Sequence, residues 1–379
     1  MAFFNKKKPA PQPEAQAGAA EIQVLMCAGK RVGKTSIMAA MQDNMDNQFP
    51  DGSVSVSIEQ QSTAGNDLLD AFRHKQMAAF RDDWKSPFYY AEESNQTGKA
   101  EESTATQETN IFVGEIRVKN AKGEYKLVNS ISFRDPRGED FGDDVSADRR
   151  KQVMGWIRES QVIIIAIDTP RLMECDENGK VGGFHDGFNK PEEITNFIKQ
   201  AWQGDEQERL ILFVPLKCEL YLREGRGEEI ISRVQEGYKS LITYIRTTSR
   251  AALCSMAIVP CETMGGLEFR KFERLGGYVE GKKPGMFRSV YGYRRYENGK
   301  RAFRPKNCEQ PLLYMLMFIF GMRQKGKTSG GIFQSMSKMP AYQDLAMAHG
   351  RIAQKCIRSE KDGFFILNDP QGFLNSREA

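Results

Sequence analysis

Apolar runs of strand length alternate with stretches of helical periodicity along most of this chain. Four continuous apolar runs suit strands that are buried on both faces of a sheet. Three longer segments repeat their apolar residues at helical spacing, and a further helix is expected to begin near Lys34. This alternation predicts an α/β fold with a mostly parallel sheet. The expected strands are 22–26, 162–167, 210–215 and 252–260, and the expected helices are 191–202, 228–245 and 310–323.

Two neighbouring segments follow a different pattern. Residues 111–118 and 125–133 alternate apolar and polar side chains, as half-buried strands do. An Asn-Ala-Lys-Gly sequence lies between them, and this composition favours a turn. The sequence therefore predicts a hairpin here.

Polar segments interrupt the alternation at two places, and we interpret both as insertions. The first, 50–105, is rich in Ser, Thr, Glu and Gln and carries helical periodicity over 66–84. The second, 264–307, is basic and aromatic. The sequence Tyr-Glu-Asn-Gly-Lys at 296–300 predicts a tight hairpin turn within it.

We expect one domain with flanking segments. Residues 1–20 are rich in Ala, Pro and Gln and are expected to form a disordered leader. The domain would cover residues 21–325. Residues 326–379 would add a Gly/Ser-rich linker and a C-terminal helical appendage with one helix over 342–356.

Composition changes this picture little. The chain has 54 basic and 50 acidic residues and a net charge of +4, so its bulk charge does not indicate nucleic acid or membrane as a partner. No apolar run is long enough to span a bilayer. The seven cysteines show neither C-x-x-C nor His/Cys metal-ligand spacing. We therefore expect a cytoplasmic protein with no transmembrane segment.

The most informative motif follows the first predicted strand. The residues from Ala28 to Ser36 read Ala-Gly-Lys-Arg-Val-Gly-Lys-Thr-Ser, close to the phosphate-loop pattern G-x-x-x-x-G-K-[ST]. Ala28 replaces the first glycine of the pattern, and Gly29 follows it. Lys34 would lie along the β- and γ-phosphates, and the Thr35 hydroxyl would bind Mg²⁺. The backbone N–H groups expected to face the phosphates belong to Gly29, Lys30, Arg31, Val32, Gly33, Lys34, Thr35 and Ser36.

A second motif ends the predicted hairpin. The sequence Asp-Pro-Arg-Gly-Glu begins at Asp135, and an Asp-x-x-Gly at a strand end is what a nucleotide switch needs. Asp135 would hold Mg²⁺ through a water, and the Gly138 N–H would donate to the γ-phosphate. An ordinary Asp-Pro-x-Gly turn is the alternative interpretation.

Two further segments are candidates for reading a base. Leu216-Lys-Cys-Glu219 keeps the basic and acidic positions of the Asn/Thr-Lys-x-Asp motif that recognises guanine. The Lys217 stem would cover the base, and Glu219 would accept from guanine N1–H and the 2-amino group. A solvated Lys/Glu pair is the alternative. More weakly, the loop that begins at Cys261 would place a backbone N–H on guanine O6.

With these four motifs in order, residues 21–325 resemble a divergent bacterial Ras-like GTPase of the TRAFAC class of P-loop NTPases, of the kind found in multi-gene GTPase systems. The resemblance implies a three-layer fold whose mostly parallel sheet has one antiparallel strand. It implies Mg²⁺ as cofactor, GTP and GDP as ligands, and slow hydrolysis of GTP as a molecular switch. It also implies a Mg²⁺-binding threonine before residue 111, for which Thr109 and Thr106 are favoured over Thr104.

The departures from the family pattern leave alternatives open. Glu139 stands where a water-orienting Gln is common, so we expect slow or partner-dependent turnover. Ala28, Glu139, Leu216 and Glu219 together keep open a non-hydrolysing pseudo-GTPase that acts as a scaffold. An ATPase is less favoured, because Lys217 and Glu219 indicate guanine.

Partners are expected at two places. The acidic residues after the second motif, Asp140, Asp143 and Asp144, and the neighbouring Arg137 are interpreted as a solvated switch region that a protein partner could contact. Basic and aromatic residues interleave over 282–306. This second pattern suits a structural hairpin first, a protein partner second and nucleic acid third. A second Gly-Lys-Thr at 326–328 follows a helix and is interpreted as linker.

Overall fold

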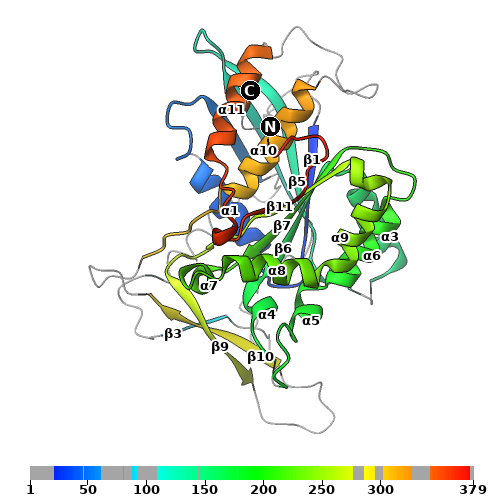
Figure 1. Ribbon diagram of the computed structural model, residues 1–379, viewed down its shortest axis with the longest axis vertical. Helices are drawn as coiled ribbons and strands as arrows, with labels where there is room; N and C mark the ends of the chain where they lie inside the picture. The colour runs from blue at the N-terminus through cyan, green and yellow to red at the C-terminus, as the bar shows by residue number, and fades with distance from the viewer. Residues whose placement is uncertain are drawn as a thin grey trace, which may run out of the picture.

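An eight-stranded sheet forms the centre of the computed structural model (Figure 1). Its strand order is β11-β8-β7-β6-β1-β5-β4-β2. The strands are β1 (Glu21–Cys27), β2 (Val54–Gln60), β4 (Asn110–Lys119), β5 (Tyr125–Asp135), β6 (Val162–Asp168), β7 (Arg209–Leu216), β8 (Cys254–Ile258) and β11 (Phe365–Asn368). The structure describes residues 21–45, 47–60, 80, 88–91, 109–142, 145–176, 178–275, 286–294, 302–325 and 342–375.

The mostly parallel α/β sheet expected from the sequence is confirmed. β1, β5, β6, β7 and β8 pair in parallel, and every residue of β6 and β7 is buried. β4 pairs antiparallel with β5, as the hairpin pattern predicted. The expectation of a single antiparallel strand is wrong, because β11 also runs against its neighbour β8.

Helices cover both faces of the sheet, and the two faces have separate hydrophobic clusters. One face packs against α1 (Lys34–Met45), α10 (Gln310–Gln324) and α11 (Tyr342–Lys355). The other face packs against α3 (Ala147–Glu159), α6 (Pro191–Ala201), α8 (Gly227–Gly237) and α9 (Lys239–Thr247). Figure 1 shows α1, α10 and α11 on one side of the strands and α3, α6 and α9 on the other. The fold thus has three layers.

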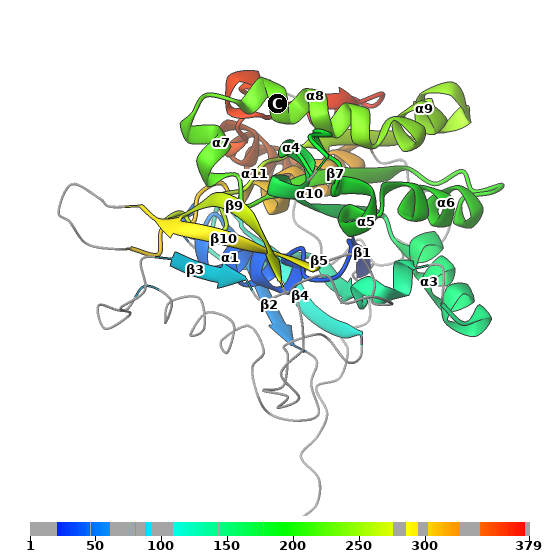
Figure 2. The same ribbon diagram turned by 90° about the horizontal axis from the view of Figure 1, so that it is seen from below.

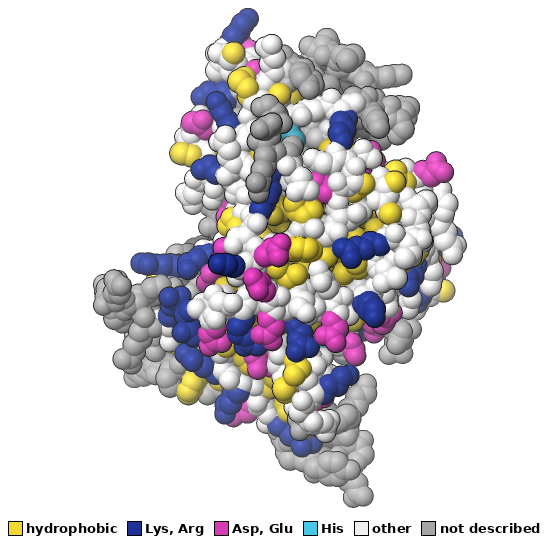
Figure 3. All heavy atoms as spheres, in the orientation of Figure 1, with side chains coloured by type: hydrophobic (Ala, Val, Ile, Leu, Met, Phe, Trp, Pro, Cys, Tyr) yellow, Lys and Arg dark blue, Asp and Glu magenta, His cyan; other side chains and the backbone are white. Residues whose placement is uncertain are grey.

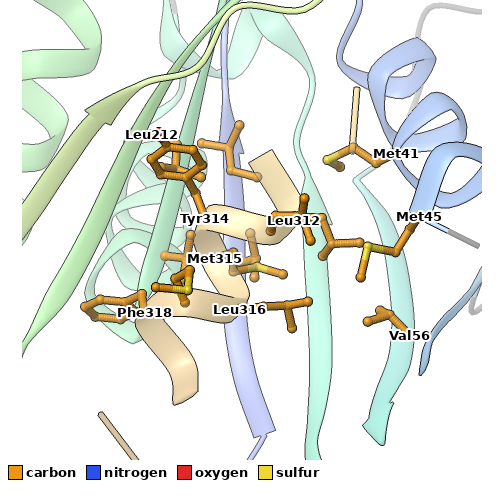
Figure 4. Packing of buried hydrophobic residues seen from close by; sticks show 14 of the residues in the cluster. Met41, Met45, Val56, Leu212, Leu312, Tyr314, Met315, Leu316 and Phe318 are labelled. Carbon is orange, nitrogen blue, oxygen red and sulfur yellow. The ribbon is translucent and has the colours of Figure 1, made fainter. Parts of the chain in front are cut away.

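The first cluster is centred on α10, which is buried from Gln310 to Gly321. Figure 4 shows Leu312 on the side of Met45 of α1, and Leu316 on the side of Val56 of β2. A helix that is apolar all round must be covered on all sides. α11 supplies the remaining cover, because its buried residues belong to the same cluster.

The single long helix expected over 228–245 is wrong at one point. The structure divides it into α8 and α9 at Tyr238, whose φ of −110° is not helical. A Cβ at Gly237 would overlap the His185 ring, so the chain passes His185 here without a side chain. The Tyr238 ring then packs against His185 and Phe213, at centroid distances of 5.4 and 5.2 Å. Glycine also weakens a helix interior by about 1 kcal/mol relative to alanine.

A second sheet combines residues from both predicted insertions. Its strands β3 (Phe88–Ala91), β10 (Met286–Tyr293) and β9 (Leu267–Leu275) pair antiparallel in that order. Leu267, Phe269 and Tyr291 pack with Phe80 into a third cluster, which also contacts Leu220. The views in Figures 1 and 2 both place this sheet beside α7 (Glu219–Arg223). Apart from Phe80, the helix expected over 66–84 lies outside the described residues, as do the leader and the turn at 296–300.

The C-terminal segment completes the main sheet and its cover. The sequence analysis ends the domain near residue 325, whereas β11 extends the sheet at β8 and α11 packs on α10. Short helices connect the larger elements: α4 (Thr169–Met173), α5 (His185–Asn189), and the 3-10 helices η1 (Gly138–Phe141) and η2 (Ser249–Ala252). In the described part of the chain, no helix has the length and apolar character that crossing a membrane requires.

If α11 belongs to the main core, its two faces should respond differently to truncation. Ile352→Ala is expected to lower the free energy of unfolding by about 2–5 kcal/mol, because Ile352 is fully buried. Met347→Ala on the same helix should change it by less than about 0.5 kcal/mol, because Met347 is 50% exposed. Urea denaturation measures both, and equal small effects would show that α11 contributes nothing to the core.

Candidate functional site

The loop between β1 and α1 makes a tight turn with two residues of positive φ. Arg31 and Gly33 have positive φ values of 61° and 116°. Helix α1 makes its first backbone bond from Ile37 to Gly33. The N–H groups at the start of the helix therefore have no acceptor within it, and they favour an anion at this end.

Gly29 explains why Ala28 is tolerated at the first position of the motif. A Cβ at Gly29 would overlap the carbonyl oxygen of Phe188, so this position requires glycine. The Ala28 side chain is fully buried in the main core instead. The position that requires glycine is therefore Gly29, one residue after the first glycine of the usual pattern.

The structure brings Lys34, Thr35 and Asp135 together, as the sequence predicted. The Thr35 hydroxyl donates to Asp135 Oδ2 at 3.0 Å, and Lys34 Nζ lies 3.7 Å from Asp135 Oδ1. Asp135 is fully buried, and burial raises the pKa of its carboxyl group although Lys34 and Thr35 oppose the shift. Its Oδ1 has no hydrogen-bond partner among the described residues. An unbonded buried carboxylate oxygen beside a hydroxyl fits Mg²⁺, which prefers oxygen ligands.

Gly138 lies directly on the loop between β1 and α1. A Cβ at Gly138 would overlap the backbone of Gly29 and Lys30, so only glycine allows this contact. The next residue, Glu139, also contacts this loop, because its Oε1 lies 2.5 Å from Lys30 Nζ. Partial burial acts to raise the pKa of Glu139, but the Lys30 ammonium holds it below the usual value.

The interpretation of Asp140 as a solvated residue is wrong. Asp140 is 1% exposed and lies between Arg137, at 3.1 Å, and Arg149, at 2.5 Å. The two guanidinium groups hold its pKa below the ordinary value against the effect of burial. Arg149 Nη2 also donates to Thr109 Oγ1 at 2.8 Å. Thr109, the favoured Mg²⁺ ligand, is therefore bonded to Arg149, while Thr104 and Thr106 lie outside the described residues.

The candidate base-reading groups are each bonded within the protein. Lys217, whose φ is 61°, forms an ion pair with Asp168. Glu219 accepts from the N–H groups of Met264, at 2.7 Å, and Gly265, at 3.1 Å. The Cys261 N–H donates to the carbonyl of Pro215 at 2.8 Å. The two loops lie in contact, because the Cys218 N–H donates to the Cys261 carbonyl at 3.1 Å, but each of the three groups is bonded within the protein.

The segment between β6 and α6 contributes residues that the sequence analysis did not identify. Asp168 ends a buried strand at the same edge of the sheet as the other motifs. This position in the sequence could have identified it as a candidate site residue. Arg171 is 1% exposed and has no comparable signal. Its guanidinium lies 3.8 Å from the Phe188 ring centroid and 4.2 Å from that of Phe272. Because the Phe188 carbonyl touches Gly29, this arginine connects β9 to the phosphate loop.

The second sheet separates its aromatic and basic residues. Phe287 packs against Phe184 at 5.2 Å, and Tyr291 is 6% exposed, so these aromatics face the protein. Basic side chains are exposed on this part of the surface, and Figure 3 shows Lys and Arg interspersed with Asp and Glu in the region where Figure 1 places β9. Three exposed members belong to β9, Arg270, Lys271 and Arg274, and three lie near it, Arg223 of α7, Arg304 and Lys306. Glu268, Glu273 and Glu262 pair with four of the six. Within the segment 282–306, Arg288 pairs with Glu273 at 2.7 Å while Phe287 and Tyr291 pack inward, which favours the structural hairpin. Residues 282–285 and 295–301 lie outside the described residues.

No protein-family model matches this chain, and no curated protein matches it either. Among the described residues, no group of three or more His, Cys, Asp or Glu is placed to hold a metal ion. A function must therefore be inferred from the loop, Asp135 and the strand arrangement.

Glu219 gives a pH-dependent test of the loop at Met264. Burial raises the pKa of Glu219 from 4.5 to about 7. The folded state therefore favours the protonated carboxyl, and the resulting stability falls as pH rises from 4.5 to 7. Glu219→Gln keeps an acceptor oxygen without the charge, so it should gain about 3 kcal/mol relative to wild type across this range. Urea denaturation at several pH values measures the difference, and a constant difference would contradict the burial of an ionisable Glu219.

Proposed function

We propose that this protein is a cytoplasmic P-loop GTPase that binds GTP with Mg²⁺ and hydrolyses it slowly to GDP and phosphate as a molecular switch. The observation that carries the proposal is the convergence of Lys34, Thr35 and Asp135 beside the glycine-containing loop. Seven free cysteines are consistent with a reducing compartment.

The sheet supports this proposal. β1 and β5, which carry the phosphate loop and Asp135, are parallel neighbours, so both motifs lie at the carboxyl edge of the sheet. Ligands bind at this edge in open α/β sheets. The antiparallel β4 lies next to β5, where the resemblance expects the antiparallel strand.

Each residue then has a defined task in hydrolysis. The loop N–H groups and Lys34 would bind and neutralise the phosphates, while Thr35 and Asp135 would hold Mg²⁺. The bound Mg²⁺ would supply positive charge that neutralises the phosphate oxygens. Gly138 lies on the loop and can offer its N–H where a third phosphate would end. Catalysis would rest mainly on positioning a water in line with the γ-phosphate and on charge stabilisation.

Guanine preference is part of the same proposal. To read the base, Lys217 would have to leave its ion pair with Asp168, and Glu219 would have to give up its hydrogen bonds from the Met264 loop. For Glu219 the exchange replaces two internal hydrogen bonds with two bonds to guanine, so its net free energy is small relative to the bonds themselves. Separating Lys217 from Asp168 would instead cost an ion pair, because the Lys217 stem only covers the base.

The proposal predicts Mg²⁺-dependent nucleotide binding that requires Lys34. Lys34→Ala should weaken binding of fluorescent GDP at least about 100-fold, because it removes a charge-assisted bond and leaves phosphate charge uncompensated. Lys327→Ala, in the second Gly-Lys-Thr of the chain, is the matched control and should bind like wild type. Titration with GDP and ADP analogues, with and without Mg²⁺, measures affinity and base preference together. Binding that is indifferent to Lys34 would exclude the phosphate loop as the site.

A non-hydrolysing scaffold is the second candidate function. The observation in its favour is that Lys217 and Glu219 are both engaged within the protein, while Glu139 pairs with Lys30 over the loop. Such a protein would bind nucleotide weakly or without turnover and would present its surfaces to partners. An ATPase has no comparable support.

Hydrolysis by a Glu139 variant separates the two candidates. Glu139→Gln removes a negative charge near the γ-phosphate position and restores an amide that can orient water. GTP turnover should therefore rise, by about tenfold if the activation barrier falls by about 1.4 kcal/mol. Glu124→Gln makes the same chemical change at an exposed position in the β4–β5 turn, so it serves as the control and should leave turnover unchanged. Phosphate release over time measures the effect, and no turnover in wild type or variant would favour the scaffold.

We place protein partners at residues 135–142 or at the outer face of the second sheet. The surface around β9 carries both exposed basic side chains and the Glu side chains that pair with them, so it suits a protein partner of complementary mixed charge. Nucleic acid is less favoured, because Phe287 and Tyr291 pack inward and do not form a stacking platform. Nucleic-acid binding that weakens steeply with roughly 100 mM added salt would reverse this order.

A further inference from the structure

The end of α5 contacts two segments of the proposed site. A Cβ at Gly29 would overlap the carbonyl oxygen of Phe188, so this carbonyl lies against the loop between β1 and α1. The Asn189 side chain accepts from the Asp168 N–H at 2.8 Å and donates to the Asp168 carbonyl at 3.3 Å. Asp168 is the last residue of β6. The end of α5 is therefore bonded to the sheet at the point where it touches the loop.

The next residue, Lys190, has a strained backbone. Its φ and ψ are both 51°, in the left-handed region that residues other than glycine rarely adopt. Its Nζ would lie 3.2 Å from a Cβ at Gly142, directly after η1. A strained conformation persists where the surrounding structure fixes it. The junction of α5 and α6 therefore depends on its neighbours to keep its shape.

Arg171 makes contacts that hold this junction. It lies in α4, where the Asp168 carboxylate accepts from its N–H at 3.2 Å. Its guanidinium lies 3.8 Å from the Phe188 ring centroid and 4.2 Å from that of Phe272 in β9. Its Nη2 also donates to the Phe287 carbonyl in β10 at 3.5 Å. One side chain therefore joins Phe188 to two strands of the second sheet.

Arg171 keeps its positive charge in this buried position. Burial lowers the pKa of its guanidinium to about 10, which is still well above neutral pH. A cation over an aromatic ring is attracted more strongly when it is removed from water. The contacts of Arg171 with Phe188 and Phe272 are therefore stronger than the same contacts would be on the surface.

We propose that Arg171 is a positioning residue that holds the Phe188 carbonyl against Gly29 and thereby connects the second sheet to the loop between β1 and α1. Its effect on nucleotide binding rests on the proposed function. Without the guanidinium, the Phe188 ring loses its contact with the second sheet, and the junction no longer confines the loop. A ligand must then order the loop itself, which weakens binding.

Nucleotide affinity tests this role. Arg171→Met should weaken binding of fluorescent GDP in Mg²⁺ about tenfold, which corresponds to about 1.4 kcal/mol. Arg171→Lys keeps the charge but lacks the planar group that stacks on rings, so it should weaken binding less. Titration of each variant gives the dissociation constants, and urea denaturation gives the free energies of unfolding.

The matched control is Arg250→Met. Arg250 is 4% exposed, lies 5.9 Å from the Trp202 ring centroid and donates to the Trp202 carbonyl at 2.6 Å. It precedes β8, so it lies at the edge of the sheet opposite the loop. Arg250→Met should also lower the free energy of unfolding, but it should leave GDP affinity unchanged.

The link to the second sheet is tested at Phe272. Phe272→Leu should weaken GDP binding in the same direction as Arg171→Met, although Phe272 lies in β9. The double variant should lose less affinity than the product of the two single effects, because both substitutions act through the same contact. Independent effects that multiply would show that the second sheet does not act through Arg171.

Amide hydrogen exchange tests the positioning without nucleotide. The N–H groups of Phe188 and Lys190 donate to the carbonyls of Phe184 and Asp186, both at 3.2 Å. If Arg171 holds the junction, both amides should exchange about tenfold faster in Arg171→Met than in wild type. Arg250→Met should leave their exchange unchanged.

The possible outcomes are distinct. Unchanged GDP affinity in Arg171→Met, with normal binding by wild type, would overturn the inference and leave the proposed function standing. Equal weakening in Arg171→Met and Arg250→Met would show a merely structural role and overturn it as well. If Arg171→Met does not fold, Arg171→Lys is compared with Arg250→Lys in the same way. If wild type binds no nucleotide, the proposed function fails, and the exchange rates alone decide whether Arg171 holds the junction.

Discussion

The burial of the Asp135 carboxylate is the constraint on which the rest of the site depends. A fully buried anion is costly unless it has compensating partners, and here those partners are Thr35 and Lys34. The interaction joins the end of β5 to the start of α1, so it fixes the loop between β1 and α1 relative to the sheet. One carboxylate oxygen still lacks a hydrogen-bond partner among the described residues. A cation bound to this oxygen would further stabilise the buried negative charge of Asp135.

The segments added to this framework all approach the same edge of the sheet. The carbonyl of Phe188 reaches Gly29, while Gly138 lies on the next residue of the loop. Arg171 connects Phe188 to the second sheet through stacked rings. The loop is thus in contact with segments that originate in three different parts of the chain. A ligand that changes the loop has physical routes to α3 and to the second sheet, although contact alone does not establish coupling.

Local patterns predicted the framework well and the connections poorly. The β4–β5 hairpin and the buried strands β6 and β7 follow from period-two alternation and continuous apolar runs. The break between α8 and α9 did not follow from the pattern, because the helical spacing continues across Gly237 and the contact with His185 is distant in sequence. β11 is only four residues long, too short to identify before its pairing with β8 is known.

The sequence by itself determined the α/β class, the glycine-containing loop after β1 and the residues that meet at Asp135. These features depend on local backbone requirements and on the rule that parallel strands end at one edge. Only the tertiary structure decided that Glu219 bonds to the Met264 loop, that Asp140 is buried and that Thr109 bonds to Arg149. Each of these depends on which charged groups come within reach after folding. Sequence spacing cannot specify such pairs, because a buried charge takes whichever partner the packing of distant segments brings to it.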